Sequence, residues 1–262
     1  MERFDLARAW KHLPGRAAPL TYVPGVSSTQ DLARHLAARG WPDGTVVVAD
    51  YQFAGRGRQG RSWWAPRGTA LLFSLLTRPA LHARRASQLT MAAAVAAAEG
   101  LESLGCKDVA VKWPNDLYVQ GRKIGGILLE TQISANAPEV ELAIVGVGIN
   151  LTVDFSERPE LQATATSLHE WLHPAPDRVR VLAAFLRFFD PIYASLRAGG
   201  SCHQHWARRL LWLGQPVSVH TAQGEIVGIA RGVTVEGALL LEMPDGEMES
   251  IWAGDVMLRP AD

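Results

Sequence analysis

The feature that most constrains the fold of this chain is a change in sequence pattern at Gly214. Before it, segments with apolar residues three or four apart alternate with short β-branched runs, as amphipathic helices alternate with buried strands. After it, apolar residues fall only in short runs separated by glycine-containing turns, which is typical of an all-β module. So short a module gains little stability unless it packs on a neighbour. We therefore predict a mixed α/β domain over residues 1–212 and a small β domain over residues 213–262.

Local patterns place the helices and strands of the larger segment. Helices are predicted where apolar residues recur three or four apart between capping signals, and strands where β-branched runs end at turn residues. The predicted helices cover residues 28–40, 87–104, 177–197 and 201–213. The predicted strands cover residues 45–49, 69–76, 109–112, 117–119, 124–130 and 140–147, with a hairpin turn at Gly121.

Charge and cysteine content exclude several classes of protein. The chain has 262 residues, 48% of them hydrophobic, and its 26 basic and 26 acidic residues cancel. It therefore has no overall basic field for nucleic-acid binding, and any anion site must be local. Two cysteines cannot build a disulfide framework, the N-terminus shows no signal-peptide pattern, and no apolar run is long enough to span a bilayer. We expect a soluble cytoplasmic protein with no membrane partner.

Residues 55–60, with the sequence GRGRQG, match the G-x-G-x-x-G pattern of dinucleotide-binding loops. Such a loop opens directly into a helix and is followed about 20 residues later by an acidic residue. Here Pro66 follows in a stretch without helical periodicity, and residues 75–86 contain no Asp or Glu. No HRD or DFG motif is present either, so the pattern predicts neither an oxidoreductase nor a kinase.

The same loop offers a different chemistry. Arg56, Arg58 and Arg61 are separated by glycines that let the backbone approach a ligand closely. Guanidinium groups bind carboxylates and phosphates through paired hydrogen bonds and stay charged when partly desolvated. A stretch rich in Arg and Gly is more often a solvated surface loop, but Trp63 and Trp64 add apolar surface that exposed loops rarely carry. We therefore interpret the loop as an anion site beside a planar ring.

Further motifs stand at the ends of predicted strands. Residues 112–116 (KWPND) place a lysine, an amide and a carboxylate on a turn, which suits phosphate and magnesium but equally suits a polar turn with a salt bridge. Residues 123–130 begin with a lysine followed by paired glycines, and residues 145–151 contain G-V-G-I-N. Glycines at these points leave room for a ligand or for close packing of strands, and the two uses are compatible.

Together these segments resemble the biotin protein ligase family. Residues 55–66 resemble its adenylate-binding loop, GRGRRGRxWxSP, with Gln59 for the usual arginine and Ala65 for the usual serine. The KWPND, K-[IL]-[AG]-G-I-L-x-E and G-x-G-I-N motifs follow in the family's order, and residues 28–30 (STQ) resemble its D-S-T-N segment. The resemblance extends over residues 25–260 and includes an SH3-like C-terminal segment, so several independent motifs carry it.

The resemblance implies a fold and an activity. The fold is α/β (α+β): a mixed β-sheet with flanking helices in a class II synthetase or lipoyl-ligase-like catalytic domain, plus a small C-terminal SH3-like β-barrel. The activity is activation of biotin with ATP to biotinyl-5'-AMP and transfer of biotin to a lysine of a biotin carboxyl carrier protein, a subunit of acetyl-CoA carboxylase or a domain of a similar biotin-dependent carboxylase. Magnesium is the implied metal. Family members are often dimers, so a homodimer is one expectation.

The matched motifs also imply the residues of the site. The predicted catalytic residues are Arg56, Arg58, Asp116 and Lys123, and Asp116 is also the predicted magnesium ligand. The residues predicted to hold biotin and ATP are Ser28, Thr29, Gln30, Gln52, Gly55, Arg56, Gly57, Arg58, Arg61, Trp63, Lys112, Asn115, Lys123, Gly126, Gly146, Gly148 and Asn150. Because a carboxylate must meet a phosphate, we expect the arginines and Lys123 to neutralise both in a site shielded from water.

Some family members carry an N-terminal helix-turn-helix domain and repress biotin synthesis genes. About 25 residues precede the first motif here, which is fewer than such a domain of roughly 60 residues needs. We therefore expect a ligase without a DNA-binding role.

Parts of the sequence also fit three other interpretations. A lipoate–protein ligase shares the fold but is expected to show an R-R-x-S-G-G-G segment, which is absent. A non-catalytic binding module would keep the pocket, although the full set of cations favours an enzyme. Residues 169–173 match the H-E-x-x-H pattern of zinc metalloproteases, but Pro174 follows at once. We expect this segment to bury Leu168, Trp171 and Leu172 instead, with its histidines facing outward.

Overall fold

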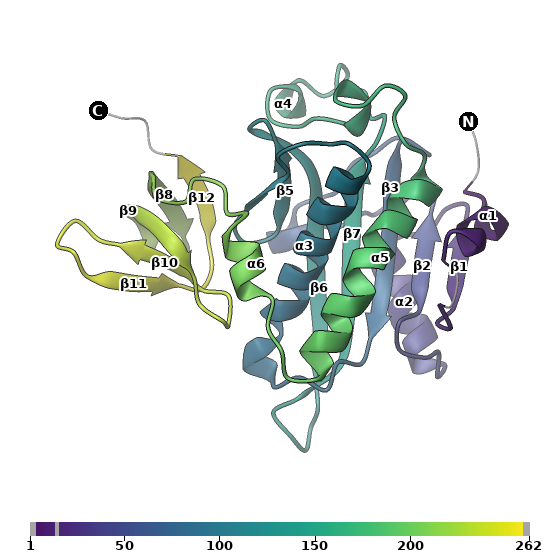
Figure 1. The fold of residues 1–262 in the computed structure, drawn as a ribbon, viewed down its shortest axis with the longest axis horizontal. Helices are drawn as coiled ribbons and strands as arrows, with labels where there is room; N and C mark the ends of the chain where they lie inside the picture. The colour runs from purple at the N-terminus through teal and green to yellow at the C-terminus, as the bar shows by residue number, and fades with distance from the viewer. Residues whose placement is uncertain (1–3, 14–15, 259–262) are drawn as a thin grey trace.

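The larger part of the chain is built around one seven-stranded sheet (Figure 1). A computed structural model describes residues 4–13 and 16–258, so the outer ends of both predicted domains lie outside the described residues. The sheet has the order β1-β2-β3-β7-β6-β5-β4, with β1 and β2 parallel and the other pairs antiparallel. Its strands are β1 (Leu20–Val23), β2 (Val46–Ala49), β3 (Ala70–Thr77), β4 (Ala110–Lys112), β5 (Asp116–Val119), β6 (Arg122–Ile133) and β7 (Val140–Asn150). The predicted mixed sheet is confirmed, and β1 is a strand that the sequence patterns did not indicate.

Helices flank this sheet on both faces. α3 and α5 lie side by side across one face, in front of the strands in Figure 1, and α2 lies against the other face. The helices are α1 (Leu6–Lys11), α2 (Thr29–Ala38), α3 (Ser87–Ser103), α4 (Pro159–Gln162), α5 (Arg178–Arg197) and α6 (His203–Ala207). The main core lies between the sheet and the α3–α5 layer, whereas Ala33 and Ala37 of α2 pack on Val47 and Leu76. The predicted arrangement of flanking helices is therefore confirmed.

Small residues let α3 and α5 approach each other closely. The alanines of α3 are almost fully buried. A Cβ added at Gly100 would lie 3.1 Å from backbone atoms of Ala184 and Phe185 in α5, so a side chain there would force the helices apart. Phe185 stacks on Phe189 at a centroid distance of 5.4 Å and meets Phe73 of β3 edge-on at 4.9 Å. This packed layer covers one face of the sheet.

Local signals place several element ends where they were predicted. The Ser28 hydroxyl accepts a hydrogen bond from the backbone N–H of Gln30 at 3.3 Å and begins α2. The Asp177 carboxylate begins α5 in the same way. Gln120 and Gly121 join β5 to β6 with φ angles of 48° and 75°, as a tight two-residue hairpin requires.

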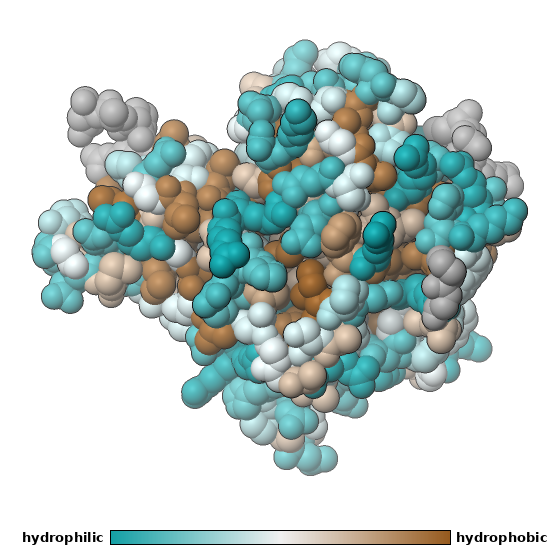
Figure 2. Space-filling model, viewed as in Figure 1, coloured by the Kyte–Doolittle hydropathy of each residue, from teal (hydrophilic) through white to brown (hydrophobic). Residues whose placement is uncertain are grey.

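The C-terminal segment forms a separate antiparallel sheet, at the left of Figure 1. Its strands are β8 (Pro216–Thr221), β9 (Gly224–Val233), β10 (Leu239–Glu242), β11 (Met248–Ile251) and β12 (Asp255–Leu258), in the order β11-β10-β9-β8-β12. This is the small β domain that the sequence predicts, whereas its boundary at residue 213 stays a prediction. Figure 2 shows apolar side chains at the surface of this sheet, where Met248, Trp252 and Met257 are more than half exposed.

The helix predicted over residues 201–213 is shorter than expected and is confined to α6. Beyond it, the backbone of Val111 in β4 exchanges two hydrogen bonds with the following segment, from Val111 N to Arg209 O at 2.7 Å and from Leu211 N to Val111 O at 2.8 Å. Pairing with a strand takes the backbone groups that a longer helix would need.

The H-E-x-x-H segment contains a 3-10 turn over Leu168–Glu170. The Glu170 carboxylate accepts hydrogen bonds from the Thr166 hydroxyl at 2.8 Å and the Ser167 N–H at 3.0 Å, and it pairs with Arg122 at 2.8 Å. Leu168 is fully buried, as expected, whereas Trp171 and Leu172 are only half-buried against the core. The glutamate of the motif therefore holds a turn together. No helix within residues 4–13 and 16–258 is both long and apolar enough to cross a membrane.

Candidate functional site

A cavity of about 270 Å³ opens on the α2 face of the large sheet. Its floor comes from β3, β6 and β7, and its walls come from the start of α2, the arginine–glycine loop and the turn before β5. The structure brings most of the predicted site residues to this one cavity. Those that line it are Ser28, Thr29, Gln30, Gln52, Arg56, Gly57, Arg58, Arg61, Trp63, Asn115, Asp116, Lys123, Gly126, Gly146 and Gly148.

Polar groups at the start of α2 are held in place by Gln52. The Gln52 side-chain oxygen accepts hydrogen bonds from Thr29 N at 2.7 Å, Thr29 Oγ1 at 2.9 Å and Ser28 Oγ at 3.4 Å. The Thr29 hydroxyl also lies 2.8 Å from the Ser74 hydroxyl of β3. Hydroxyl and amide groups fixed by neighbours in this way can recognise a polar ligand without first being ordered.

Two buried polar atoms at the cavity have no hydrogen-bond partner within the described residues. Gln30 donates to the backbone oxygen of Leu128 at 3.1 Å, but its own Oε1 is buried and unpaired. The indole nitrogen of Trp63 is in the same state. Leaving buried donors and acceptors unpaired is costly, so such atoms point to a ligand that supplies the missing partners.

Glycines on the cavity floor make room for the Trp63 indole. A Cβ added at Gly148 would lie 2.7 Å from the ring, and one added at Gly126 would lie 3.3 Å from it. The Lys123 ammonium lies 5.8 Å from the ring centroid and 2.7 Å from the Asp116 carboxylate. The cavity therefore combines a flat apolar surface with a cation and an anion at its edge.

The arginine–glycine loop folds back on itself as a small hairpin. Gly57 N donates to Arg61 O at 2.7 Å, and Trp63 N donates to Gly55 O at 2.9 Å. Gln59, at the tip, has a φ of 54°, in the left-handed region. The hairpin places its arginines along one wall of the cavity rather than scattering them over the surface.

Each arginine of the loop reaches a different part of the molecule. Arg56 binds Asp31 of α2 through two hydrogen bonds of 2.7 and 2.9 Å. Arg58 donates to the Asn115 side-chain oxygen at 3.3 Å, and Arg61 pairs with Asp255 of β12. The loop is thus held between the large sheet and the C-terminal sheet.

Burial affects the cations of this region unequally. It lowers the pKa of the Arg58 guanidinium, while Asp255 and Asp116 act in the opposite direction. It also lowers the pKa of Lys112, whose ammonium lies 5.7 Å from the Tyr118 ring centroid. An arginine remains charged even so, because its ordinary pKa is far above neutrality. Arg58 is therefore a partly desolvated cation, which interacts with an anion more strongly than a solvated one.

Three predicted residues lie beside the cavity without lining it. Gly55 forms the base of the loop, where an added Cβ would lie 2.6 Å from the Trp63 backbone oxygen. Lys112 lies between aromatic rings, and Asn150 donates to the Thr166 backbone oxygen at 3.1 Å. Their proposed roles at the ligand are therefore less direct than those of the lining residues.

Sequence reasoning missed several residues of the site. Leu72, Leu128, Leu161 and Asp255 line the cavity, and Asp31 holds Arg56. No sequence motif marks Leu72 or Leu161, whereas Leu128 stands in the K-[IL]-[AG]-G-I-L-x-E motif without having been predicted to line the site. Asp255 belongs to the C-terminal segment that resembles the family, but its approach to Arg61 requires the fold.

Comparison with known proteins agrees with this geometry. The sequence profile described as "Biotin/lipoate A/B protein ligase family" matches residues 22–150, and the one described as "Biotin protein ligase C terminal domain" matches residues 212–259. The chain is 34% identical over 227 residues to the biotin--[acetyl-CoA-carboxylase] ligase of Paracoccus denitrificans, a match that covers 82% of this chain and 89% of that protein. The chain belongs to the biotin protein ligase family.

Other relatives agree with this assignment. The bifunctional ligase/repressor BirA of Bacillus subtilis (strain 168) is 37% identical over 242 residues, covering 91% of this chain and 74% of its own length. The structure of the biotin protein ligase from Aquifex aeolicus in complex with biotin and ATP is similar with a TM-score of 0.75 and 29% identity, covering 93% of this chain and 99% of that one. Biotin protein ligases of known structure thus share the fold that surrounds the cavity.

Proposed function

We propose that this chain is a biotin protein ligase that activates biotin with ATP and transfers it to a lysine of a carrier protein. The observation that carries the proposal is the convergence of Arg56, Arg58, Arg61 and Lys123 on one cavity that also holds an unpaired buried acceptor and donor. An anionic substrate with a polar ring system fits that combination.

The first step joins two anions. A biotin carboxylate oxygen attacks the α-phosphorus of ATP, the bond from that phosphorus to the bridging oxygen breaks, and pyrophosphate leaves with the electron pair. Negative charge builds on the phosphoryl oxygens as this happens. Arg58 and Lys123 are the cations that we place at those oxygens, because preorganised charges in a partly desolvated site stabilise such a transition state most effectively.

The second step makes an amide. The neutral lysine amine of the carrier attacks the carbonyl carbon of biotinyl-5'-AMP, the bond from that carbon to the phosphate oxygen breaks, and AMP leaves. The nitrogen loses a proton as the amide forms. Asp116 lines the cavity as a carboxylate and can accept a hydrogen bond from the incoming amine. The proposed role of the arginine loop is to cover the adenylate, which water would otherwise hydrolyse.

Magnesium fits this site as an ion held mainly by substrate. Magnesium is usually bound by one or two carboxylates together with phosphate oxygens. Asp116 supplies one carboxylate at the cavity, and the described residues contain no cluster of three or more His, Cys, Asp or Glu side chains that could hold a metal ion. Asp116 would therefore hold the ion with the phosphates, and the ion would supply charge neutralisation there.

The partner that we propose is a biotin carboxyl carrier protein or a similar domain of a biotin-dependent carboxylase. The name of the Paracoccus denitrificans relative states an acetyl-CoA carboxylase as acceptor for that protein. A homodimer, a cytoplasmic location and the lack of a DNA-binding role stay predictions from the sequence.

The test is exchange of labelled pyrophosphate into ATP in the presence of magnesium, with biotin or with lipoate. We expect exchange with biotin and at most a trace with lipoate. Purified carrier domain is then added, and biotin on its lysine is detected by mass spectrometry. Exchange with lipoate alone, or exchange with neither acid from folded protein, would overturn the proposed function.

A further inference from the structure

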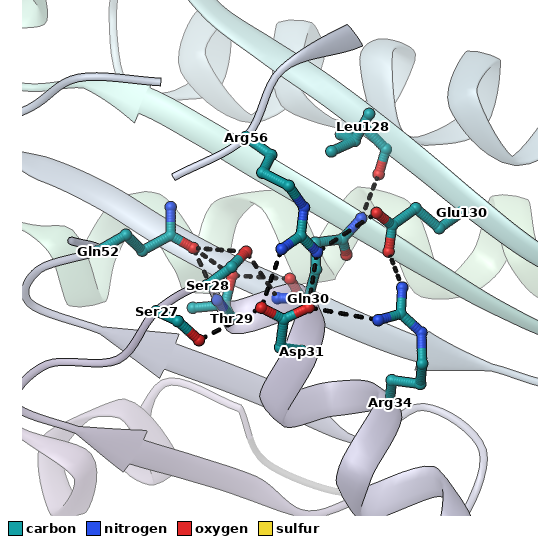
Figure 3. Close-up of polar contacts among 11 residues, drawn as sticks. Ser27, Ser28, Thr29, Gln30, Asp31, Arg34, Gln52, Arg56, Leu128 and Glu130 are labelled. Atoms are coloured by element: carbon teal, nitrogen blue, oxygen red, sulfur yellow. Dashed lines mark hydrogen bonds and ion pairs between the residues drawn. The ribbon is translucent and has the colours of Figure 1, made fainter. Parts of the chain in front are cut away.

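A network of charged residues holds Arg56 at the edge of the cavity (Figure 3). The Arg56 guanidinium binds Asp31 through Nη1 and Nη2, and its Nη2 also lies 3.4 Å from Glu130 Oε1 of β6. Arg34 pairs with the same two carboxylates from the solvent side, at 3.3 Å from Asp31 and in a closer contact with Glu130. Two carboxylates therefore hold one side chain that lines the cavity.

Asp31 belongs to the support of the cavity and not to its lining. Arg56 lines the cavity, whereas Asp31, Arg34 and Glu130 do not. Asp31 is the third residue of α2, where the helix dipole favours a negative charge, and the Ser27 hydroxyl lies 3.2 Å from its carboxylate. It is therefore fixed independently of any ligand. The Arg56 hydrogen bonds lower the pKa of Asp31, so the carboxylate stays charged at neutral pH.

Arg56 keeps free N–H groups for a ligand while Asp31 and Glu130 hold it. A guanidinium has five N–H groups. Asp31 takes two of them and Glu130 takes one, so two remain. Arginine is a long and flexible side chain, and an arginine that is already held loses less conformational entropy when it binds an anion.

We propose that Asp31 is a positioning residue that, together with Glu130, fixes Arg56 and the base of the 55–62 hairpin before substrate binds. The expected effect of Asp31 on catalysis rests on the proposed function, because we assign Arg56 to the carboxylate of biotin. The network joins α2, β6 and the hairpin, three parts of the chain that meet at the end of the cavity where Thr29, Gln30 and Gln52 lie.

A role as a competitor of the substrate predicts the opposite change in the KM for biotin. If Asp31 competed with the substrate carboxylate for Arg56, its removal would free the guanidinium and lower the KM for biotin. A positioning residue predicts that its removal raises that KM. The direction of the change therefore decides between the two roles.

The kinetic test compares Asp31→Asn and Asp31→Ala with the wild type in pyrophosphate exchange. We expect the KM for biotin to rise about five- to tenfold in Asp31→Ala and less in Asp31→Asn, with the KM for ATP changed less than about twofold, because a charge-assisted pair is lost only at the biotin end. The matched control is Asp177→Asn, since Asp177 also lies at the N-terminal end of a helix and pairs with an arginine, with 37% side-chain exposure against 38% for Asp31. We expect this control to keep wild-type kinetics.

A double-mutant cycle separates positioning from general damage. In an Arg56→Ala background, Asp31→Ala should cause no further rise in the KM for biotin, because Asp31 acts through Arg56. An additive effect in the double variant, or a fall in the KM of the single variant, would overturn the proposal.

Hydrogen exchange tests the same proposal without substrate, so it stands apart from the proposed function. We expect the backbone amides of residues 55–62 to exchange faster in unliganded Asp31→Asn than in the wild type, with α3 unchanged. Equal exchange of residues 55–62 in the two proteins would contradict the proposal even if the wild type proved to be an active ligase. Lack of pyrophosphate exchange in the wild type would instead remove the proposed function alone.

Discussion

Gly148 is the residue at which a single methyl group should affect the cavity most directly. An added Cβ would lie 2.7 Å from the Trp63 ring, closer than real contacts allow, and the ring is confined by Gly126 and Lys123. We expect Gly148→Ala to weaken biotin binding by about 1–3 kcal/mol, the usual cost of overpacking, which corresponds to roughly a 5- to 150-fold rise in Kd. Isothermal titration calorimetry measures this. Gly25→Ala is the matched control, because its Cβ would meet no atom closer than 3.5 Å and should leave the Kd unchanged.

The two cysteines should be unreactive in the native protein and should make stability depend on alkaline pH. Burial raises the pKa of Cys106 to about 11 and that of Cys202 to about 12, against an ordinary value of 9.0. A pKa raised by folding contributes stability that is fully present below pH 9 and is lost as the pH rises toward 11 or 12. We expect a thiol reagent at pH 8 to label neither cysteine until urea is added. The urea concentration at the midpoint of unfolding should decrease as the pH is raised above 9, and the decrease should be smaller in Cys202→Ala. Rapid labelling of native protein would contradict this.

The residues that could be predicted from sequence are those whose chemistry is local. Three arginines within six positions, with glycines among them, predict a local anion site, and all three line one cavity. Asp31, Glu130 and Asp255 could not be found in this way. They reach the arginines across 25, 74 and 194 positions of the chain, and nothing in a single sequence specifies such pairings.

A buried ion pair links the end of β2 to the start of α5. Asp50 pairs with Arg178, with 6% and 9% of the side chains exposed, and the Tyr22 hydroxyl donates to Asp50 at 2.6 Å. Removing one partner of a buried pair leaves a charge in a medium that solvates it poorly. We expect Asp50→Asn to lower the free energy of unfolding by about 3 kcal/mol, at the lower end of the usual range.

Urea unfolding measures this difference. Glu160→Gln, which breaks an exposed pair with Arg158, should change stability by less than about 1 kcal/mol and is the control. Asp50 lies two residues before Gln52, so the variant should also weaken biotin binding at temperatures where it remains folded. Equal stability of Asp50→Asn and wild type would show that the pair contributes nothing to the junction of β2 and α5.

Element prediction succeeded where one periodic pattern ran long enough and failed where tertiary contacts decided the conformation. The alanine-rich stretch became α3 almost as predicted, because its length and spacing left no alternative. β1 has only four residues and pairs in parallel with β2. A run of that length is too short to predict either the strand or its pairing. The predicted helix after residue 200 ended early because its backbone pairs with β4.

The two sheets of the molecule meet through a few specific contacts. The Trp113 indole donates to the Gly237 backbone oxygen at 2.9 Å, and the Gln88 side chain donates to the Val235 backbone oxygen at 2.5 Å. The segment between β9 and β10 thus rests on the start of α3 and on the KWPND turn. This docking brings Asp255 to the wall of the cavity, so the site is completed by both parts of the chain.

The contact between Asp255 and Arg61 should couple the C-terminal sheet to substrate binding. Arg61 is 65% exposed and Asp255 34%, so the pair is worth little in stability, but it is the link between β12 and the arginine hairpin. We expect Asp255→Asn to raise the KM for ATP about two- to fivefold at low salt, with no measurable change in melting temperature. Because solvent-exposed ion pairs are screened, the difference from wild type should disappear near 1 M salt, where the Debye length is about 3 Å. Asp245→Asn, at an exposed turn of the same sheet, is the control and should behave as wild type at every salt concentration.

A KM for ATP that is equal in Asp255→Asn and wild type at low salt would mean that the C-terminal sheet rests against the site without acting on it. A difference that persists at high salt would assign Asp255 a direct contact with the nucleotide.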